Sequence, residues 1–452
     1  MTRIPSLTAV FCAGLIILGG AAAHAQPSAP IRLTVVDAVT RAFDASHRLA
    51  EIRARERGAQ AAVRGAQAGE KPIASASAGY SRTNHVEEFG IFQGGVGRVI
   101  YPDIPDNVTS RVSVQWPIYT SGRVDALERA AQAEVQALGA DLDTARADLR
   151  FETVRAYWAA ATAREAARVI AESMGRAEAQ LKDARQRFDV GLIPPNEVSS
   201  LEAQHSRERA QLIEARNIVE NTSIDLRRLI GAEADAVIEL ADGLTGAAGS
   251  PSRPEVATVD AASAAVKEAL TQRPERKALT LRIGVAEARE QAALAASRPT
   301  IAVGGGYDFA NPNPRIFPRE SAWQDSWDAS VNVTWPFFDS GRSRAQAAEA
   351  AAIAAATRER LRDLDTVIAA DVRQRLLDVE SAQAMVEAAT DAVRSATEAR
   401  RIVGDRFAAG VATSTDVLVA QVALLEIELA RTRAQASVKL AEARLQRVVG
   451  KP

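Results

Sequence analysis

Two different spacings of apolar residues alternate along the chain. In residues 123–189 and 342–408 they recur every three or four positions, as at Leu361, Leu364 and Ile368, which is the spacing of one helix face. Proline is absent from both segments and glycine is rare. We therefore predict two helices of about 67 residues, each roughly 100 Å long at 1.5 Å per residue.

Four shorter segments are rich in Ala, Arg and Glu and contain few helix breakers. These features favour helix. We predict further helices over residues 35–70, 196–230, 262–297 and 415–449.

Before each long helix the spacing changes to strict alternation. Val112, Val114 and Trp116 share one face of a predicted strand 108–119, and a strand 327–338 shows the same pattern. We place weaker partner strands at 72–83 and 299–310. A soluble half-buried sheet shows similar alternation, but a length near 9–11 residues and tryptophans at the strand ends favour strands that face lipid on one side and water on the other.

The chain contains an internal duplication. The segment Gln115–Arg123 recurs as Thr334–Arg342, and the same offset of 219 positions carries Arg187–Gly191 onto Arg406–Gly410. Repeats of this kind indicate two copies of one supersecondary unit. We predict a first repeat over 26–231, a linker rich in Gly, Ala, Ser and Pro over 232–260, and a second repeat over 261–452.

The first 25 residues have the features of a cleavable signal peptide: Arg3, an uncharged apolar run and a final Ala-His-Ala. Cys12, the single cysteine, would leave with this peptide. Phe11 stands where a lipoprotein cleavage site needs a small residue, so we do not expect a lipoprotein. The exported chain would then have no disulfide and no cysteine-bound metal.

Composition and scattered polar residues argue against other classes. The net charge of −2 offers no basic excess for nucleic acid. The chain is 47% hydrophobic but only 5% aromatic, too thin an apolar content for a large enzyme core. His47, His85 and His205 stand isolated without ligand spacing. We expect no catalytic residues, no metal and no cofactor.

The predicted sheet cannot close by itself. Four strands are fewer than the eight of the smallest membrane barrels, and lipid does not tolerate an open sheet edge. The simplest closed assembly takes four strands from each of three chains, which makes a homotrimer with a barrel of twelve.

The duplicated Trp-Pro-x-aromatic-x-Ser-Gly-Arg and Arg-Phe-x-x-Gly motifs, together with their order and spacing, resemble the TolC family of outer-membrane efflux and secretion channels. The resemblance spans Leu33 to Gly450. It implies a mainly α fold with a small β part: a trimeric 12-stranded outer-membrane β-barrel on a long periplasmic α-helical barrel. It further implies a passive duct that performs no chemistry and is engaged by a periplasmic adaptor protein and an inner-membrane pump of the RND, ABC or MFS type.

The turns between strand and long helix have a structural interpretation. Proline suits a strand end because it lacks an N–H group, and a serine oxygen suits a helix N-cap. We therefore assign structural roles to Pro117, Ser121, Gly122, Pro336, Ser340 and Gly341.

The ends of the long helices hold the candidate contact surface. Gly191 and Gly410 suit helix termination in the left-handed region, and Thr413 has capping-box spacing to Asp416. We expect Leu192, Ile193 and Val411 to be exposed. By the resemblance, these hairpins form the periplasmic mouth and meet the adaptor through Arg187, Phe188, Gly191, Leu192, Ile193, Arg406, Phe407, Gly410 and Val411.

By the same resemblance, a constriction would be formed by Asn196, Glu197, Thr415 and Asp416. An inter-protomer lock of some family members uses an aromatic hydroxyl and an arginine, whereas this chain has Phe407 and Ala412 at those positions. The sequence departs from the family pattern there.

Two other classes remain as alternatives. A periplasmic helical scaffold without a pore would explain the Ala/Glu/Arg-rich rods and the signal peptide, but not four alternating strands with terminal tryptophans. An exported helical enzyme such as a lyase would need a clustered His/Asp/Glu/Tyr set, which the sequence does not offer.

Overall fold

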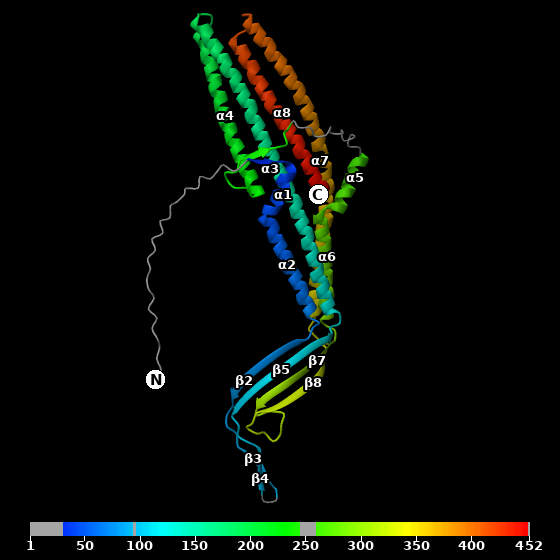
Figure 1. Ribbon diagram of the computed structural model, residues 1–452. Helices are drawn as coiled ribbons and strands as arrows, with labels where there is room; N and C mark the ends of the chain where they lie inside the picture. Colours follow the sequence, from blue (N-terminus) through cyan, green and yellow to red (C-terminus); the bar gives the residue numbers. More distant parts are fainter. Residues whose placement is uncertain (1–29, 94–95, 245–258, 451–452) are drawn as a thin grey trace, which may run out of the picture.

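The computed structural model describes residues 30–93, 96–244 and 259–450. The predicted signal peptide and part of the predicted linker lie outside these residues. Figure 1 shows a long sheaf of helices with a β-sheet at one end and two helical hairpin tips at the other. Among the described helices, none is both long and apolar enough to cross a bilayer.

The two longest helices occupy the ranges expected from the apolar spacing, Arg123–Asp189 for α3 and Arg342–Ala408 for α7. Each turns back into a closing helix at its tip, α4 after α3 and α8 after α7 (Figure 1). The remaining helices pack alongside the long ones. The shorter helices are α1 (Val35–Ala45), α2 (His47–Ala68), α4 (Pro195–Ile230), α5 (Val259–Gln272), α6 (Pro274–Ala295) and α8 (Ser414–Val449).

Two predicted helices are interrupted. The segment predicted as 35–70 breaks at Ser46, whose backbone is extended and whose hydroxyl accepts from the Leu49 amide at 3.3 Å, so that it caps a new helix. The segment predicted as 262–297 breaks at Arg273. Pro274 follows it, and a proline disfavours helical backbone in the residue before it while suiting the first position of a helix.

A small parallel sheet at mid-length ties distant segments together. Strands β1 (Ile31–Leu33) and β6 (Ile238–Leu240) pair there, a feature too short to be seen in the sequence pattern. Tyr157 of α3 is fully buried beneath them; its hydroxyl donates to the Leu33 carbonyl at 3.1 Å and accepts from the Asp242 amide at 2.9 Å. Burial raises the pKa of this phenol above its ordinary value.

The larger sheet has the strand order β2-β5-β7-β8, and every neighbouring pair is antiparallel. β8 begins earlier than predicted and ends at Thr334, because Pro336 two residues later cannot donate to a neighbouring strand. β2 and β8 are the edges of the sheet within one chain. The strands are β2 (Ile73–Arg82), β5 (Asp106–Tyr119), β7 (Thr300–Asn311) and β8 (Gln324–Thr334).

A separate hairpin of β3 (Phe89–Gln93) and β4 (Val96–Tyr101) extends the connection between β2 and β5. Neither of its strands was among those predicted from the sequence. Figure 1 shows it at the far end of the sheet from the helices.

The strand-to-helix turns differ in detail from the prediction. Ser121 and Ser340 are not N-caps: both have φ near +55°, and the N-caps are Gly122 and Gly341 at φ +79° and +84°. Successive left-handed residues reverse the chain, and glycine adopts that backbone without strain. The Ser121 hydroxyl instead donates to the Pro299 carbonyl at 2.5 Å.

In the second repeat the missed capping residue is Asp339. Its carboxylate accepts from the amides of Gly341 (3.0 Å) and Ser343 (2.9 Å). The hydrogen bond from the Ser343 hydroxyl, and after it those from these amides, lower the pKa of Asp339. Pro117 lies within β5, which ends at Tyr119, the predicted end of that strand, and the register against β7 shifts between these two residues.

Candidate functional site

Two regions carry the residues singled out in the sequence, and they lie at opposite ends of the helical sheaf (Figure 1). One is the four-stranded sheet. The other is the pair of helical tips where α3 turns into α4 and α7 into α8.

One face of the sheet is apolar and uncovered. The strand register aligns Val112 of β5 with Tyr307 of β7 and Trp327 of β8. Their exposed fractions are 55%, 49% and 74%. A row of large apolar side chains this exposed, on alternate positions of paired strands, is the surface that lipid-facing strands present.

Two tryptophans mark the helix-proximal border of this face. The indole N–H of Trp116 donates to the Glu70 carbonyl at 2.9 Å, and that of Trp335 donates to the Ser297 carbonyl at 3.2 Å. Phe337 and Phe338 are highly exposed just beyond β8. Such aromatic residues, gathered where the sheet meets the helices, match the belt found where a bilayer meets water.

The opposite face of the sheet is polar. Arg111 of β5 pairs with Asp308 of β7 at 2.5 Å and with Asp328 of β8 at 2.8 Å, all on the face away from the apolar row. Gly306 lies under the guanidinium, and a Cβ there would collide with it. The pairing of Arg111 with Asp308 and Asp328 depends on the strand register, which the alternation pattern of the sequence does not give.

Both tips end their long helix at a glycine in the left-handed region, as predicted. Gly191 and Gly410 have φ of +74° and +75°. At the first tip Gly191 donates to the Phe188 carbonyl and Leu192 to the Arg187 carbonyl, both at 2.8 Å. The second tip repeats the arrangement with Gly410 and Val411. This is the left-handed termination that glycine favours after a helix.

The two closing helices are capped differently. Thr413 and Asp416 form the predicted capping box: the Asp416 amide donates to the Thr413 hydroxyl at 3.2 Å, and the Thr413 amide donates to the Asp416 carboxylate at 2.8 Å. The Thr413 backbone and then its hydroxyl lower the pKa of Asp416. α4 begins at Pro195, a residue that suits the first turn of a helix, and its Pro194 N-cap gives no side-chain bond.

One contact joins the tips. The guanidinium carbon of Arg187 lies 4.9 Å from the centre of the Phe407 ring, while its Nε is 3.0 Å from an Asp183 oxygen. Arginine over an aromatic face is an attractive arrangement. A phenyl ring suffices for it, so this chain uses Phe407 for a contact that needs no hydroxyl.

The exposure of the tip residues agrees with the prediction except at one position. Leu192 and Val411 are 73% and 68% exposed, and Phe188 is 42% exposed. Ile193 was predicted to be exposed but is half-buried, because it packs against Leu181 and the other apolar residues between α3 and α4.

The four residues assigned to a constriction lie in the first turns of α4 and α8. Asn196, Thr415 and Asp416 are exposed and Glu197 is half-buried. Within the part of the chain that the structure describes, no hydrogen bond or ion pair joins Asn196 or Glu197 of α4 to Thr415 or Asp416 of α8. Their meeting in a ring remains a prediction. The described residues also hold no cluster of three or more metal-binding side chains.

Comparisons with known proteins agree on one family. A family model described as "outer membrane efflux protein" matches residues 38–232 and 265–451, two segments that lie within the two predicted repeats except that the first extends one residue beyond 231. Protein CyaE of Bordetella pertussis is 28% identical over 323 residues, which is 70% of this chain and 65% of that protein. The outer membrane protein TolC of Vibrio cholerae is 25% identical over 274 residues, 60% of each chain. The match spans less than two thirds of the length of these two relatives.

Among solved structures, the outer membrane protein VceC of Vibrio cholerae superposes with a TM-score of 0.76 at 21% identity. The match covers 92% of this chain and 96% of VceC. At this identity the similarity shows that the two chains share a fold.

Proposed function

The chain belongs to the outer membrane efflux protein family, and from this membership we propose that it is the outer-membrane channel of a tripartite efflux or type I secretion system. It would act as a passive duct, coupled through a periplasmic adaptor to an inner-membrane pump. It performs no chemistry and uses no cofactor. A cleavable signal over residues 1–25 would export it, without a lipid anchor.

The observation that carries this function is the two-faced sheet. Its apolar face exposes Val112, Tyr307 and Trp327, and its polar face carries Arg111 with two aspartates. A sheet with one face for lipid and one for water separates the two media only when it surrounds a bore. The helical sheaf attached to it supports a continuation of that bore outside the membrane.

The open edges support assembly. Among the described residues, β2 and β8 each have one unpaired side, and unpaired backbone groups are too costly in hydrocarbon to remain exposed. Pairing β2 of one chain with β8 of the next satisfies both edges. Three chains of four strands each would close a barrel of twelve, and cyclic symmetry would make every junction identical.

The far end supports contact with an adaptor. Leu192 and Val411, and to a lesser extent Phe188, expose apolar surface at the hairpin tips in the part of the chain that the structure describes. Exposed apolar groups clustered at one point are typical of a docking surface. The resemblance assigns the adaptor to these tips and the pump beyond it.

The alternative is a periplasmic helical scaffold without a pore. It would leave the aromatic face of the sheet in water, at a cost of about 25 cal/mol for each Å² of apolar surface left exposed. The sheet therefore favours the channel.

The decisive test uses the purified full-length protein. Extraction from outer membranes should give trimers that dissociate on heating, and these should conduct ions in planar lipid bilayers. Recovery of a monomer from the soluble periplasmic fraction, or trimers that never conduct, would contradict the channel and favour the scaffold.

A further inference from the structure

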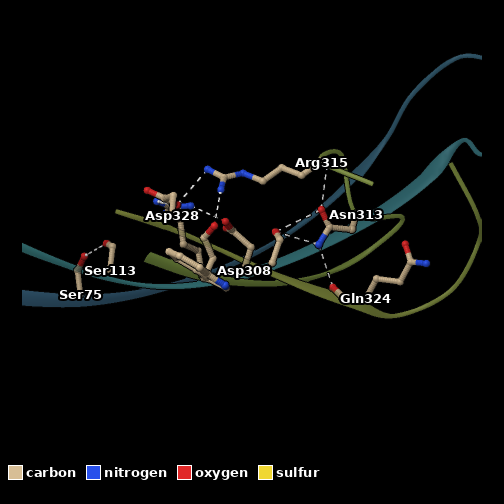
Figure 2. Close-up of polar contacts among 10 residues, drawn as sticks. Ser75, Ser113, Asp308, Asn313, Arg315, Gln324 and Asp328 are labelled. Atoms are coloured by element: carbon tan, nitrogen blue, oxygen red, sulfur yellow. Dashed lines mark hydrogen bonds and ion pairs between the residues drawn. The ribbon is translucent and has the colours of Figure 1, made fainter. Parts of the chain in front are cut away.

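The connection between β7 and β8, residues 312–323, lies at the end of the sheet far from the helices and folds back over it (Figures 1 and 2). Asn313 is its anchor and is 1% exposed. The Asn313 side-chain amide donates to the Gln324 carbonyl at 3.0 Å and to the Ser326 hydroxyl at 3.1 Å. A buried amide held this way fixes the start of the loop.

Arg315 holds the loop against β8. Its guanidinium donates to an Asp328 oxygen and to the Trp327 carbonyl, each at 3.0 Å (Figure 2). Asp328 is the residue that also pairs with Arg111. Through Asp328, Arg315 of the loop becomes part of the charged cluster on the polar face of the sheet.

Arg319 extends the same loop towards the other strands. It donates to the side-chain oxygen of Asn107, at the start of β5, at 3.0 Å and to the Tyr101 hydroxyl of β4 at 3.3 Å. The loop residues therefore reach from β8 to β5, with β7 between them.

Asn313 and Arg315 hold the loop on the polar face, and only its last residue, Trp323, lies on the apolar side, where its ring stacks on Phe309 at 4.9 Å between centroids. Asp328 and Ser326 belong to the polar face, and Ala310, also on that side of β7, is only 1% exposed. On the opposite face Trp327 remains 74% exposed. In a barrel with lipid outside, the loop lies on the inner side.

We propose that the β7–β8 loop narrows the outer exit of the bore, and that Arg315 on Asp328 both holds it there and sets the charge that a passing solute meets. This rests on the channel function proposed above. Arg111 and Arg315 balance Asp308 and Asp328, so each chain contributes no net charge at this point. Loss of Arg315 leaves one negative charge per chain, hence three in a trimer, and rings of carboxylates favour cations.

The test is single-channel recording of purified trimers in planar bilayers. Arg315→Gln should raise conductance about twofold and shift the reversal potential in a salt gradient towards cations. A second variant with residues 314–322 replaced by a short Asn-Gly turn should widen the exit without relying on one side chain. Arg82→Gln is the matched control, because Arg82 also lies at the outer end of the sheet, with its guanidinium 3.4 Å from Asp106, but projects from the apolar side.

The outcomes separate the two proposals. If the wild type conducts, and both Arg315→Gln and the loop-shortened variant have the conductance and reversal potential of the wild type, the loop inference alone is overturned. Equal changes in Arg82→Gln and Arg315→Gln also overturn it, since position on the inner face would then not matter. A wild type that inserts but never conducts overturns the channel function, and the loop inference with it.

Discussion

Neighbouring residues on β5 should respond very differently to the same charge. Val112 is the seventh of the fourteen residues of β5 and is 55% exposed on the apolar face, whereas Ser113 points to the polar face and lies 2.9 Å from the Ser75 hydroxyl. Both belong to a strand paired on both sides, so neither forms the junction between chains. The two positions share one depth and differ only in the face that they present.

The free-energy cost of a lysine at each position follows from that depth in the bilayer. A lysine facing lipid near the bilayer midplane costs ~2–4 kcal/mol, while a lysine facing the lumen is tolerated. A trimer carries the substitution three times, so Val112→Lys should cost the assembled barrel ~6–12 kcal/mol if the three sites act independently. Ser113→Lys should cost little beyond its hydrogen bond to Ser75.

The assay compares both variants with wild type for heat-dissociable trimer in outer-membrane fractions, by gel electrophoresis without boiling. Val112→Lys should reduce the trimer band strongly and Ser113→Lys should leave most of it. Equal amounts of trimer in the two variants, or a greater loss with Ser113→Lys, would refute the assignment of faces and with it the lipid contact.

Other predictions concern the elements that hold the rods in place. Tyr157→Phe leaves buried backbone groups without their hydrogen-bond partner. It should lower the free energy of unfolding, measured in thermal melts, by ~1–3 kcal/mol. Tyr119 has an exposed side chain, so Tyr119→Phe should leave the free energy of unfolding nearly unchanged. Gly410→Ala forces a side chain into left-handed backbone and should cost ~1–2 kcal/mol, whereas Gly404→Ala within α7 should stabilise. Because hydrogen bonds from Thr413 lower the pKa of Asp416 in the folded chain, its cap stabilises fully above the ordinary carboxyl pKa of 3.8 and is lost as the pH falls below it. The melting temperature of wild type should therefore fall more than that of Asp416→Asn across this range, and a parallel fall would contradict the cap.

The long helices could be predicted from sequence because their signals are local. Apolar spacing and the absence of proline set α3 and α7, and the glycines at 191 and 410 set their ends. The interruption at Arg273 was missed although Pro274 marks it, because a single proline is compatible with a kinked helix as well as a new one.

The caps at the strand-to-helix turns show a different limit. The sequence offers Ser340 and Asp339 side by side as capping residues, and only the backbone conformation decides between them. Two left-handed residues in succession, at 340 and 341, bring the Asp339 carboxylate to the free amides of Gly341 and Ser343.

The cluster of Arg111, Asp308 and Asp328 on the sheet could not be predicted from the sequence. Arg111 is 197 residues away from Asp308 along the chain, and their contact exists only in one strand register. Arg315 joins them through a loop whose path no periodicity encodes. Residues that act through long-range pairing in this way need coordinates, whereas the alternation that made the sheet two-faced did not.

The central claim is that each chain supplies only part of a closed sheet around a bore. It is tested most directly by determining the structure of the assembly purified from outer membranes. The account predicts three chains, with β2 of each hydrogen-bonded to β8 of the next and a continuous passage from the sheet to the helical tips. Sheet edges left unpaired or packed against water-soluble protein, with no passage along the axis, would contradict it.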